Sequence, residues 1–209
     1  MNKELLKRVE RGFATPEEIK VMRDFFVETL ATGRYEYETM QCLGCPCWYT
    51  PRFLDLPESD PNDLFIDRME EITGLELLPT YSFARRYVPG HNLAWHRDRQ
   101  SCEISLTLCV SAKGESYPLI VNQGGGDKSR TRLEEIHLSP GDAVIYNGHT
   151  IGHGRKFMQH PQEALYQLFV HYVDANGEYA DYAGEAIYSA HRRAMDGFAT
   201  QAPIDDDMP

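Results

Sequence analysis

The sequence places a histidine and an aspartate two residues apart in "AWHRDRQSCEISLTL", where His96 and Asp98 stand at the start of an alternating run. In an extended chain, alternate side chains point the same way, about 6–7 Å apart along the backbone. This spacing lets an imidazole and a carboxylate converge on one metal ion. A solvated turn is the simple alternative, because a histidine–aspartate pair is by itself a weak signal.

A metal site needs a third ligand from elsewhere in the chain, and "YNGHTIGHGRKF" offers His149 and His153. Two histidines and one carboxylate on one face of an ion leave the remaining positions open. That arrangement is typical of non-haem Fe(II) centres, which bind a co-substrate and O₂ on the same ion. The residues therefore predict an iron site built on His96, Asp98 and one of these two histidines.

Two helices are expected in the N-terminal part of the chain, in "ATPEEIKVMRDFFVETLATG" and "DPNDLFIDRMEEITG". Each segment has a capping residue, Thr15 or Asp60, followed at once by a proline, which suits the first helical position. Each segment also ends in a glycine, Gly33 or Gly74, a residue typical of helix exits.

From residue 77 onward the chain predicts strands separated by turns. The expected strands are "LPTYSFARRYV", "CEISLTLCV", "YPLIVNQ", "LEEIHL", "DAVIYN" and "LYQLFVHYV". Consecutive short strands without intervening helices favour an antiparallel barrel or sandwich. We expect a single domain over residues 1–209, with a mostly helical support over 1–76, a β-core over 77–174 and a C-terminal cover and tail over 175–209. One more helix is expected in "GEAIYSAHRRAM".

Composition narrows the range of partners. A net charge of −11 makes nucleic acid an unlikely ligand. No membrane span is expected, because the chain has no apolar run of about 18 residues. The five cysteines are an odd number and are not spaced like a disulfide framework, which favours a reducing, cytoplasmic setting. "CLGCPCW" lacks the second pair that a structural zinc site needs, so we expect buried or loop thiols there.

The order of these motifs is similar to that of a known family. A tyrosine and a glycine turn in "RYVPG" precede the histidine–aspartate pair, and "LSPGDAVIYNG" leads to a distal histidine. The pattern resembles the 2-oxoglutarate- and Fe(II)-dependent oxygenases, in their prolyl-hydroxylase-like branch, over about residues 81–173. The resemblance implies a mainly β protein with flanking helices, built on a double-stranded β-helix (jelly-roll, cupin-like) core. It also implies Fe(II), 2-oxoglutarate and O₂, with ascorbate as an aid in vitro.

The resemblance also implies roles for individual residues. His96, Asp98 and His153 match the catalytic iron ligands. His153 is preferred to His149 because the family's distal histidine lies later on its strand, near a basic residue. Tyr87 resembles the tyrosine whose hydroxyl contacts 2-oxoglutarate, although a buried core tyrosine is the alternative.

The sequence departs from the family pattern at the group that holds the far carboxylate of 2-oxoglutarate. Many members carry a lysine or arginine on the final strand, but "PQEALYQLF" has no cation, and Gln167 lies there instead. Arg155 lies two residues after His153, so on a regular strand both face the same way. A guanidinium can grip a carboxylate through two parallel hydrogen bonds. We expect Arg155 to take this role, with Arg85 and Arg86 as alternatives.

The expected activity is hydroxylation of an unactivated C–H bond in a small molecule or a peptide side chain, with release of succinate and CO₂. Related halogenases have a small residue at the position of Asp98, which leaves room for chloride, so the carboxylate favours hydroxylation. Two other functions stay open. One is a metal-dependent jelly-roll (cupin-type) enzyme that does not use 2-oxoglutarate, and the other is a non-catalytic β-sandwich binding module. The oligomeric state is not predicted.

Overall fold

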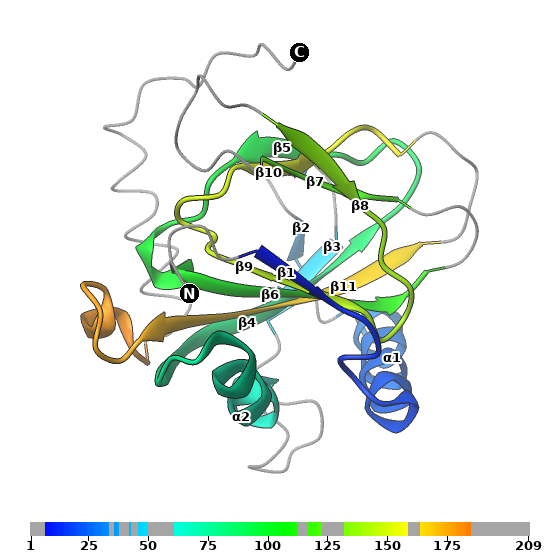
Figure 1. The fold of residues 1–209 in the computed structure, drawn as a ribbon. Coiled ribbons are helices and arrows are strands. Elements are labelled where there is room, and N and C mark those ends of the chain that lie inside the picture. The colour runs from blue at the N-terminus through cyan, green and yellow to red at the C-terminus, as the bar shows by residue number, and fades with distance from the viewer. Residues whose placement is uncertain are drawn as a thin grey trace.

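Two antiparallel sheets face each other in the computed structural model, and two helices lie against the outer side of the larger sheet (Figure 1). The structure describes residues 7–33, 36–37, 42, 46–49, 61–112, 117–122, 132–158 and 164–184. In the view of Figure 1 the smaller sheet is at the top and the helices are at the bottom.

The first helix, α1 (Pro16–Ala31), begins where the sequence predicts it. The Thr15 side chain accepts a hydrogen bond from the backbone N–H of Glu18, and the Glu18 carboxylate accepts one from the backbone N–H of Thr15. This reciprocal capping box satisfies two N–H groups that the helix cannot pair internally. At the other end Gly33 has a φ of 69°, a left-handed conformation that glycine adopts without strain.

The second helix, α2 (Pro61–Thr73), also has the predicted extent. It is followed by Gly74, whose backbone N–H donates to the carbonyl oxygen of Glu70 at 2.8 Å. The expected cap, Asp60, lies outside the described residues, as does the body of the helix expected after Gly184.

The larger sheet has seven strands and the smaller sheet has four. The order in the larger sheet is β1 (Lys7–Glu10), β9 (Ala143–Tyr146), β6 (Ile104–Ser111), β11 (Leu165–Asp174), β4 (Leu77–Tyr87), β3 (Pro46–Tyr49) and β2 (Glu36–Tyr37). The order in the smaller sheet is β5 (Leu93–His96), β10 (His153–Arg155), β7 (Leu119–Asn122) and β8 (Leu133–Ile136). Short 3₁₀ turns follow β5, at Gln100–Cys102, and β11, at Ala180–Tyr182.

The mainly β, jelly-roll prediction is confirmed, and all six predicted segments form strands. Five short strands, β1 to β3, β5 and β10, were not among the predicted segments. Their sequence signal is weak, because these segments lack a run of β-branched and aromatic residues between turn residues.

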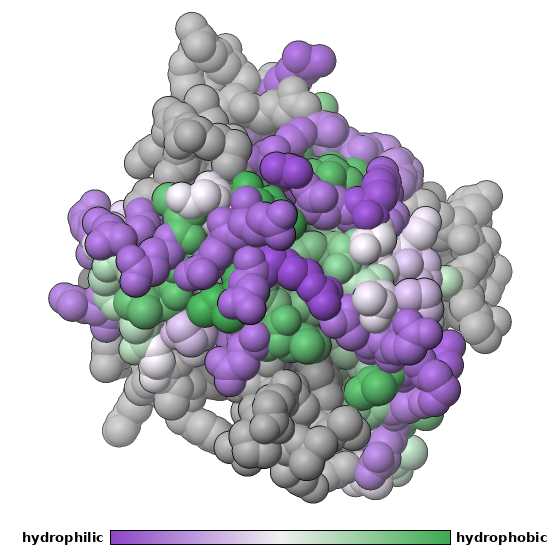
Figure 2. All heavy atoms as spheres, turned by 60° about the horizontal axis from the view of Figure 1, so that its bottom comes forward, coloured by the Kyte–Doolittle hydropathy of each residue, from purple (hydrophilic) through white to green (hydrophobic). Residues whose placement is uncertain are grey.

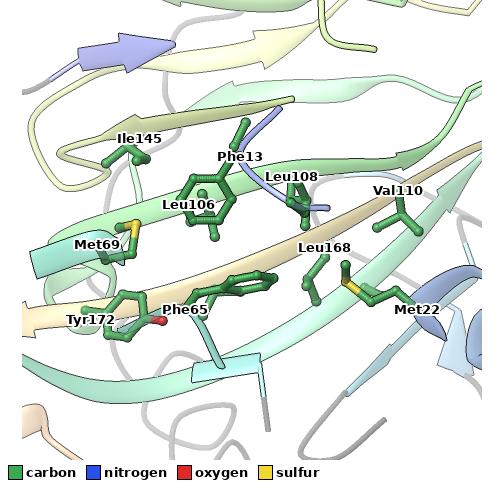
Figure 3. Packing of buried hydrophobic residues seen from close by; sticks show 14 of the residues in the cluster. Phe13, Met22, Phe65, Met69, Leu106, Leu108, Val110, Ile145, Leu168 and Tyr172 are labelled. Carbon is green, nitrogen blue, oxygen red and sulfur yellow. The ribbon is translucent and has the colours of Figure 1, made fainter. Parts of the chain in front are cut away.

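The hydrophobic core on the helix side is built by alternation along β6. The side chains of Leu106, Leu108 and Val110 point toward the helices (Figure 3). Together with Ile104 they form one cluster with residues of both helices. The helix residues of this cluster include Met22, Phe26, Phe65 and Met69, all at most 1% exposed. Each such side chain contributes about 1.5–3 kcal/mol on burial, so the helices hold the large sheet firmly in place.

The other face of β6 is more polar and faces the space between the two sheets. Ser105, Thr107 and Cys109 are all buried there, beside a second cluster that includes Tyr87, Val121 and Tyr146. The alternation predicted from sequence therefore has its polar face inward, where a site can be built.

The outer surface over the helices is mainly hydrophilic, with hydrophobic side chains in patches between (Figure 2). Neither of the two described helices combines the length and apolar character needed to cross a bilayer.

Candidate metal centre

The two histidines of the centre come from neighbouring strands of the smaller sheet. β5 ends at His96 and β10 begins at His153, and the antiparallel register sets these two residues directly opposite each other. Their ring centroids are 4.3 Å apart. Strand pairing thus brings together two residues that are far apart in the sequence.

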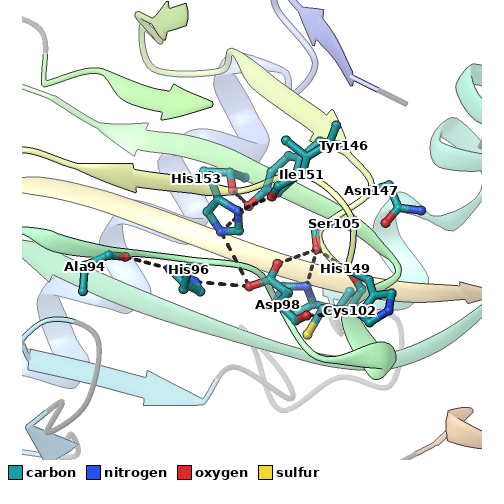
Figure 4. Close-up of polar contacts among 12 residues, drawn as sticks. Ala94, His96, Asp98, Cys102, Ser105, Tyr146, Asn147, His149, Ile151 and His153 are labelled. Atoms are coloured by element: carbon teal, nitrogen blue, oxygen red, sulfur yellow. Dashed lines mark hydrogen bonds and ion pairs between the residues drawn. The ribbon is translucent and has the colours of Figure 1, made fainter. Parts of the chain in front are cut away.

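Asp98 completes the set from the loop after β5 (Figure 4). Its backbone N–H donates to the carbonyl oxygen of Gly148 at 2.9 Å, which fixes the loop against the end of β9. Its Oδ1 lies 3.3 Å from Nε2 of His96 and 3.5 Å from Nε2 of His153. The three residues offer ligand atoms that all lie within 4.8 Å of one another.

The second nitrogen of each ring is already engaged. Nδ1 of His96 lies 2.8 Å from the carbonyl oxygen of Ala94, and Nδ1 of His153 lies 3.0 Å from that of Ile151. A carbonyl can only accept, so each Nδ1 carries the hydrogen and, in a neutral ring, Nε2 presents its lone pair to Asp98. Metal-bound histidines are oriented in this way.

Burial and charge set the protonation of the centre. Burial lowers the pKa of His153 to about 4, with the Asp98 carboxylate opposing the shift. Burial would raise the pKa of Asp98, but His153 and His96 together hold it well below its ordinary value. At neutral pH, therefore, a lone pair of His153 faces an ionised carboxylate.

The arrangement fits a divalent metal ion. Lone pairs on two nitrogens and one oxygen repel one another unless a cation lies between them. Ligands bound about 2.1 Å from an ion at right angles to each other are about 3 Å apart, close to the separations observed. The three donors occupy one side, which leaves other coordination positions open.

His149 lies outside this set. Its Nδ1 is 3.4 Å from the backbone oxygen of Asp98, and its ring packs edge-on against Tyr179 with centroids 5.2 Å apart. The structure thus brings His96 and Asp98 together with His153, and places His149 at the rim of this site, next to Tyr179.

A second group of potential ligands, Asp98, Cys102 and His171, lies behind the first. Burial raises the pKa of the Cys102 thiol to about 12, and the hydroxyl of Tyr81 lies 2.9 Å from its sulfur. The Cys102 thiol is thus engaged with Tyr81, whereas Oδ1 of Asp98 faces His96 and His153 on the other side.

Arg155 is buried deeper between the sheets, with 2% of its surface exposed. Its Nη2 donates to Oε1 of Gln167 at 2.7 Å, and its Nη1 donates to the backbone oxygen of Tyr117. The guanidinium carbon lies 5.5 Å from the ring centroid of Tyr87 and 5.1 Å from that of Tyr117. Within the described ranges no aspartate or glutamate forms an ion pair with Arg155, and its Nε has no hydrogen-bond partner.

Arg85 and Arg86, the two alternatives to Arg155, lie on opposite faces of β4. Arg85 lies on the inner face of β4, where its Nη1 donates to the hydroxyl oxygen of the fully buried Tyr87 at 2.9 Å. Arg86 lies on the opposite face, with its guanidinium carbon 5.9 Å from the ring centroid of Tyr166, which packs with the helix-side core. Arg86 therefore faces away from the centre.

Three further residues near the centre were missed by sequence reasoning. The hydroxyl of Tyr146 lies 3.4 Å from Nε2 of His153, while Ser105 and His171 lie behind Asp98. The polar alternation of β6 pointed to Ser105 in general terms. His171 interrupts an apolar strand, and nothing in its local sequence ties it to Asp98.

The cysteines differ in part from expectation. Cys102 and Cys109 are free, buried thiols. Cys42 is buried and disulfide-bonded, which corrects the expectation of a thiol at this position.

Comparison with known proteins places the fold. No family model matches the sequence, and no curated protein matches it. Solved structures do match. A carbocyclase, SnoK from nogalamycin biosynthesis, described as non-haem and α-ketoglutarate-dependent, aligns over 97% of this chain and 89% of its own, with 11% identity and a TM-score of 0.67.

Two prolyl hydroxylases are similar as well. The prolyl-4-hydroxylase of Pseudomonas putida matches over 80% of this chain and 92% of its own, with 12% identity and a TM-score of 0.60. The enzyme of Trichoplax adhaerens, solved with a hypoxia inducible factor peptide fragment, matches over 80% and 83%, with 8% identity and a TM-score of 0.62. The chain thus has the fold of the 2-oxoglutarate- and Fe(II)-dependent oxygenases, which confirms the predicted resemblance at the level of the fold.

Proposed function

We propose that this protein is a non-haem Fe(II)- and 2-oxoglutarate-dependent dioxygenase that hydroxylates an unactivated C–H bond. His96, Asp98 and His153 are the iron ligands. The observation that carries the proposal is the convergence of two Nε2 lone pairs on one carboxylate oxygen, with both Nδ1 atoms held by backbone carbonyls. The fold of known oxygenases of this class supports it.

The residues of the chain prepare the reaction by binding and orientation. A bound Fe(II) would supply the redox chemistry by which O₂ oxidises 2-oxoglutarate to succinate and CO₂ and hydroxylates the substrate. Asp98 supplies the negative charge that a divalent cation requires. Ala94 and Ile151 hold the two imidazoles by their backbone oxygens, so that no rotation is needed when the metal enters.

Arg155 binds the far carboxylate of 2-oxoglutarate in this proposal. A buried guanidinium without a carboxylate partner is strongly disfavoured, so its surroundings imply an anion that the described part of the chain does not supply. Gln167 and the backbone of Tyr117 hold two of its nitrogens, which orients the fork and leaves Nε–H to donate. Gln167 thus positions the arginine, in place of a cation on the final strand.

Tyr87 assists at the same carboxylate. Its hydroxyl oxygen accepts a hydrogen bond from Arg85, which leaves its own hydrogen to donate to the anion. Its ring lies under the guanidinium of Arg155 and packs in the core between the sheets. The tyrosine can therefore serve both as a core residue and as a donor.

The substrate in this proposal is a small molecule or a peptide side chain. The Trichoplax relative was solved with a peptide and the carbocyclase serves a biosynthesis, so the fold accommodates both classes. Asp98 stands where related halogenases have a small residue, so hydroxylation is favoured over halogenation in this proposal.

Metal binding tests the proposal directly. Wild-type protein, kept without O₂, is expected to bind one Fe(II) per chain. Asp98→Ala and His153→Ala are expected to lose most of that binding, because each removes a ligand. His149→Ala is the matched control, since this rim histidine should leave the iron content unchanged. Full iron occupancy in both ligand variants would rule out the site.

A second measurement separates the proposal from its nearest rival. An Fe(II) enzyme of the cupin type that does not use 2-oxoglutarate would bind the metal equally well. We therefore expect iron-loaded protein to release succinate from 2-oxoglutarate when candidate amino acids, peptides and other metabolites are screened. Substrate conversion without consumption of 2-oxoglutarate would favour the rival. A protein that binds no metal at all would be a binding module.

A further inference from the structure

A hydrogen-bonded chain behind the metal centre runs from the large sheet to Asp98. Oδ1 of Asp98 faces the two histidines, whereas its Oδ2 lies 3.2 Å from the hydroxyl of Ser105 on β6. The same hydroxyl lies 3.0 Å from Nδ1 of His171 on β11. Figure 4 shows the Ser105 side chain beside Asp98. Ser105 and His171 are 0% and 3% exposed.

We propose that Ser105 and His171 are positioning residues that hold Asp98 as a ligand through Oδ1 alone. The inference rests on the proposed function, because it takes the first three residues as the metal site. Neither residue contacts the metal position itself, and each acts through the carboxylate.

The hydrogen-bond count assigns the direction of the chain. The Ser105 hydroxyl has a single hydrogen, and its two acceptors are Oδ2 of Asp98 and the backbone oxygen of Cys102, at 3.2 and 3.0 Å. The third contact must therefore bring a hydrogen to the serine oxygen, and it can come only from Nδ1–H of His171. His171 thus donates to Ser105, and the serine hydrogen is shared between Oδ2 of Asp98 and the carbonyl oxygen of Cys102, of which the charged carboxylate is the stronger acceptor.

The tautomer of His171 agrees with this direction. With the hydrogen on Nδ1, Nε2 is left as a bare acceptor, and this buried atom has no hydrogen-bond partner among the residues that the structure describes. An unsatisfied buried polar atom costs about 1–3 kcal/mol. The hydrogen bond that the His171 ring does form is the one from Nδ1 to Ser105, and Ser105 in turn contacts the metal ligand Asp98.

Packing is close around Oδ2 of Asp98. A Cβ on Gly148 would lie 2.3 Å from Oδ2 of Asp98 and 2.6 Å from the backbone oxygen of Cys102, so the loop presses closely on this oxygen. The His171 ring packs against Tyr81 and Phe83, with centroids 4.7 and 5.8 Å away. Segments from β6, β11 and the end of β9 thus hold the outer side of Asp98.

The expected consequence concerns coordination. If Oδ2 lost its donor, the carboxylate would no longer be held with Oδ1 toward His96 and His153, and the three donors would be less well placed for a metal ion. Loss of an outer hydrogen-bond partner of a metal ligand typically lowers metal affinity by about 10- to 100-fold. We expect that range for removal of either Ser105 or His171.

The experiment uses Co(II) alone as the probe, without 2-oxoglutarate, and measures affinity by competition with a chelator together with the visible spectrum of the bound ion. Ser105→Ala and His171→Phe are expected to bind Co(II) about 10- to 100-fold more weakly, with an altered spectrum. His171→Asn should restore binding to within about threefold of wild type, because its amide N–H takes the place of Nδ1–H. Thr73→Val removes a buried hydroxyl on α2, far from the centre, and should leave both readouts unchanged.

The outcomes are distinguishable. Wild-type affinity and spectrum in Ser105→Ala and His171→Phe would overturn the positioning role, and so would equal weakening in the Phe and Asn variants. If Ser105→Ala does not fold, the two His171 variants decide, because one keeps the ring and the other keeps the donor. Failure of wild type to bind Co(II), or unchanged binding in Asp98→Ala, would instead overturn the proposed metal site.

Discussion

At the scale of single residues, Arg155 shows most clearly how this chain departs from the pattern it resembles. The expected cation on the final strand is replaced by Gln167, and Gln167 contacts the guanidinium of Arg155 from the neighbouring sheet. Because Arg155 lies two residues after His153, the sequence predicted that the two side chains face the same way. Both are buried, at 2% and 3% exposure, although the register between β10 and β5 shifts between them.

Replacement of Arg155 tests its proposed role. Removal of one side of a buried charge pair costs on the order of 3–5 kcal/mol, so Arg155→Ala should raise the 2-oxoglutarate concentration for half-maximal succinate release by about 100-fold or more. Arg155→Lys should recover only part, because a point charge replaces a two-pronged grip. Iron binding should survive in both. Arg86→Ala, on the far face of β4, is the control, and an unchanged requirement in Arg155→Ala would move the role to Arg85.

At the scale of elements, the pairing of β5 with β10 decides whether the two histidines meet. Glycines flank His153 on both sides, and neither has a positive φ. A Cβ on Gly154 would lie 2.9 Å from the backbone oxygen of Leu93 and 3.2 Å from Cα of Trp95. A Cβ on Gly152 would meet only the Trp95 ring, at 3.0–3.2 Å. The missing side chains let the two strands approach.

The two glycines should therefore differ in their response to substitution. In Gly154→Ala the added methyl group collides with the backbone of β5, so β5 must move and His96 must move with it. We therefore expect at least a tenfold loss of metal affinity. Gly152→Ala pushes on a half-buried indole that can shift, and affinity should stay within about threefold. Metal titration of both variants, with circular dichroism to verify folding, makes the comparison. Equal losses would show that strand approach is not the controlling factor.

At the scale of the whole molecule, the fold keeps imidazoles neutral in its interior. Burial lowers the pKa of both His153 and His171 to about 4, although the Asp98 carboxylate opposes each shift. The unfolded chain binds protons at these positions with an ordinary pKa of about 6.5. The unfolded state thus holds more protons between pH 6.5 and pH 4, and folding stability must fall as the pH falls through that window.

This linkage is measurable in the metal-free protein. For a pKa of about 4 folded and about 6.5 unfolded, each histidine contributes about 2 kcal/mol of stability at pH 7 that is lost by pH 5. The free energy of unfolding, measured with urea, should be lower at pH 5 than at pH 7 by about that amount for each of the two histidines. His171→Phe should flatten the dependence by the share of one histidine, since a phenyl ring does not titrate. A stability that is equal at pH 7 and pH 5 would contradict buried neutral imidazoles.

The sequence by itself determined the elements and the order of the chemical groups. Caps, prolines and exit glycines marked both helices, and runs of β-branched and aromatic residues between turn residues marked six strands, because these signals act over neighbouring residues. The histidine–aspartate pair and the distal "GHGR" segment were visible for the same reason. Short strands such as β1 and β5 escaped, since their segments lack such a run.

Only the tertiary structure decided which groups meet. Strand register set His153, not His149, opposite His96, and it turned the polar face of β6 inward so that Ser105 reaches Asp98. His171 joined them from a strand whose sequence reads as plain core. Such contacts join residues far apart in the chain, and a shift of one residue in register would reverse every side chain. Local sequence cannot encode that register, because it is fixed by the packing of both sheets together.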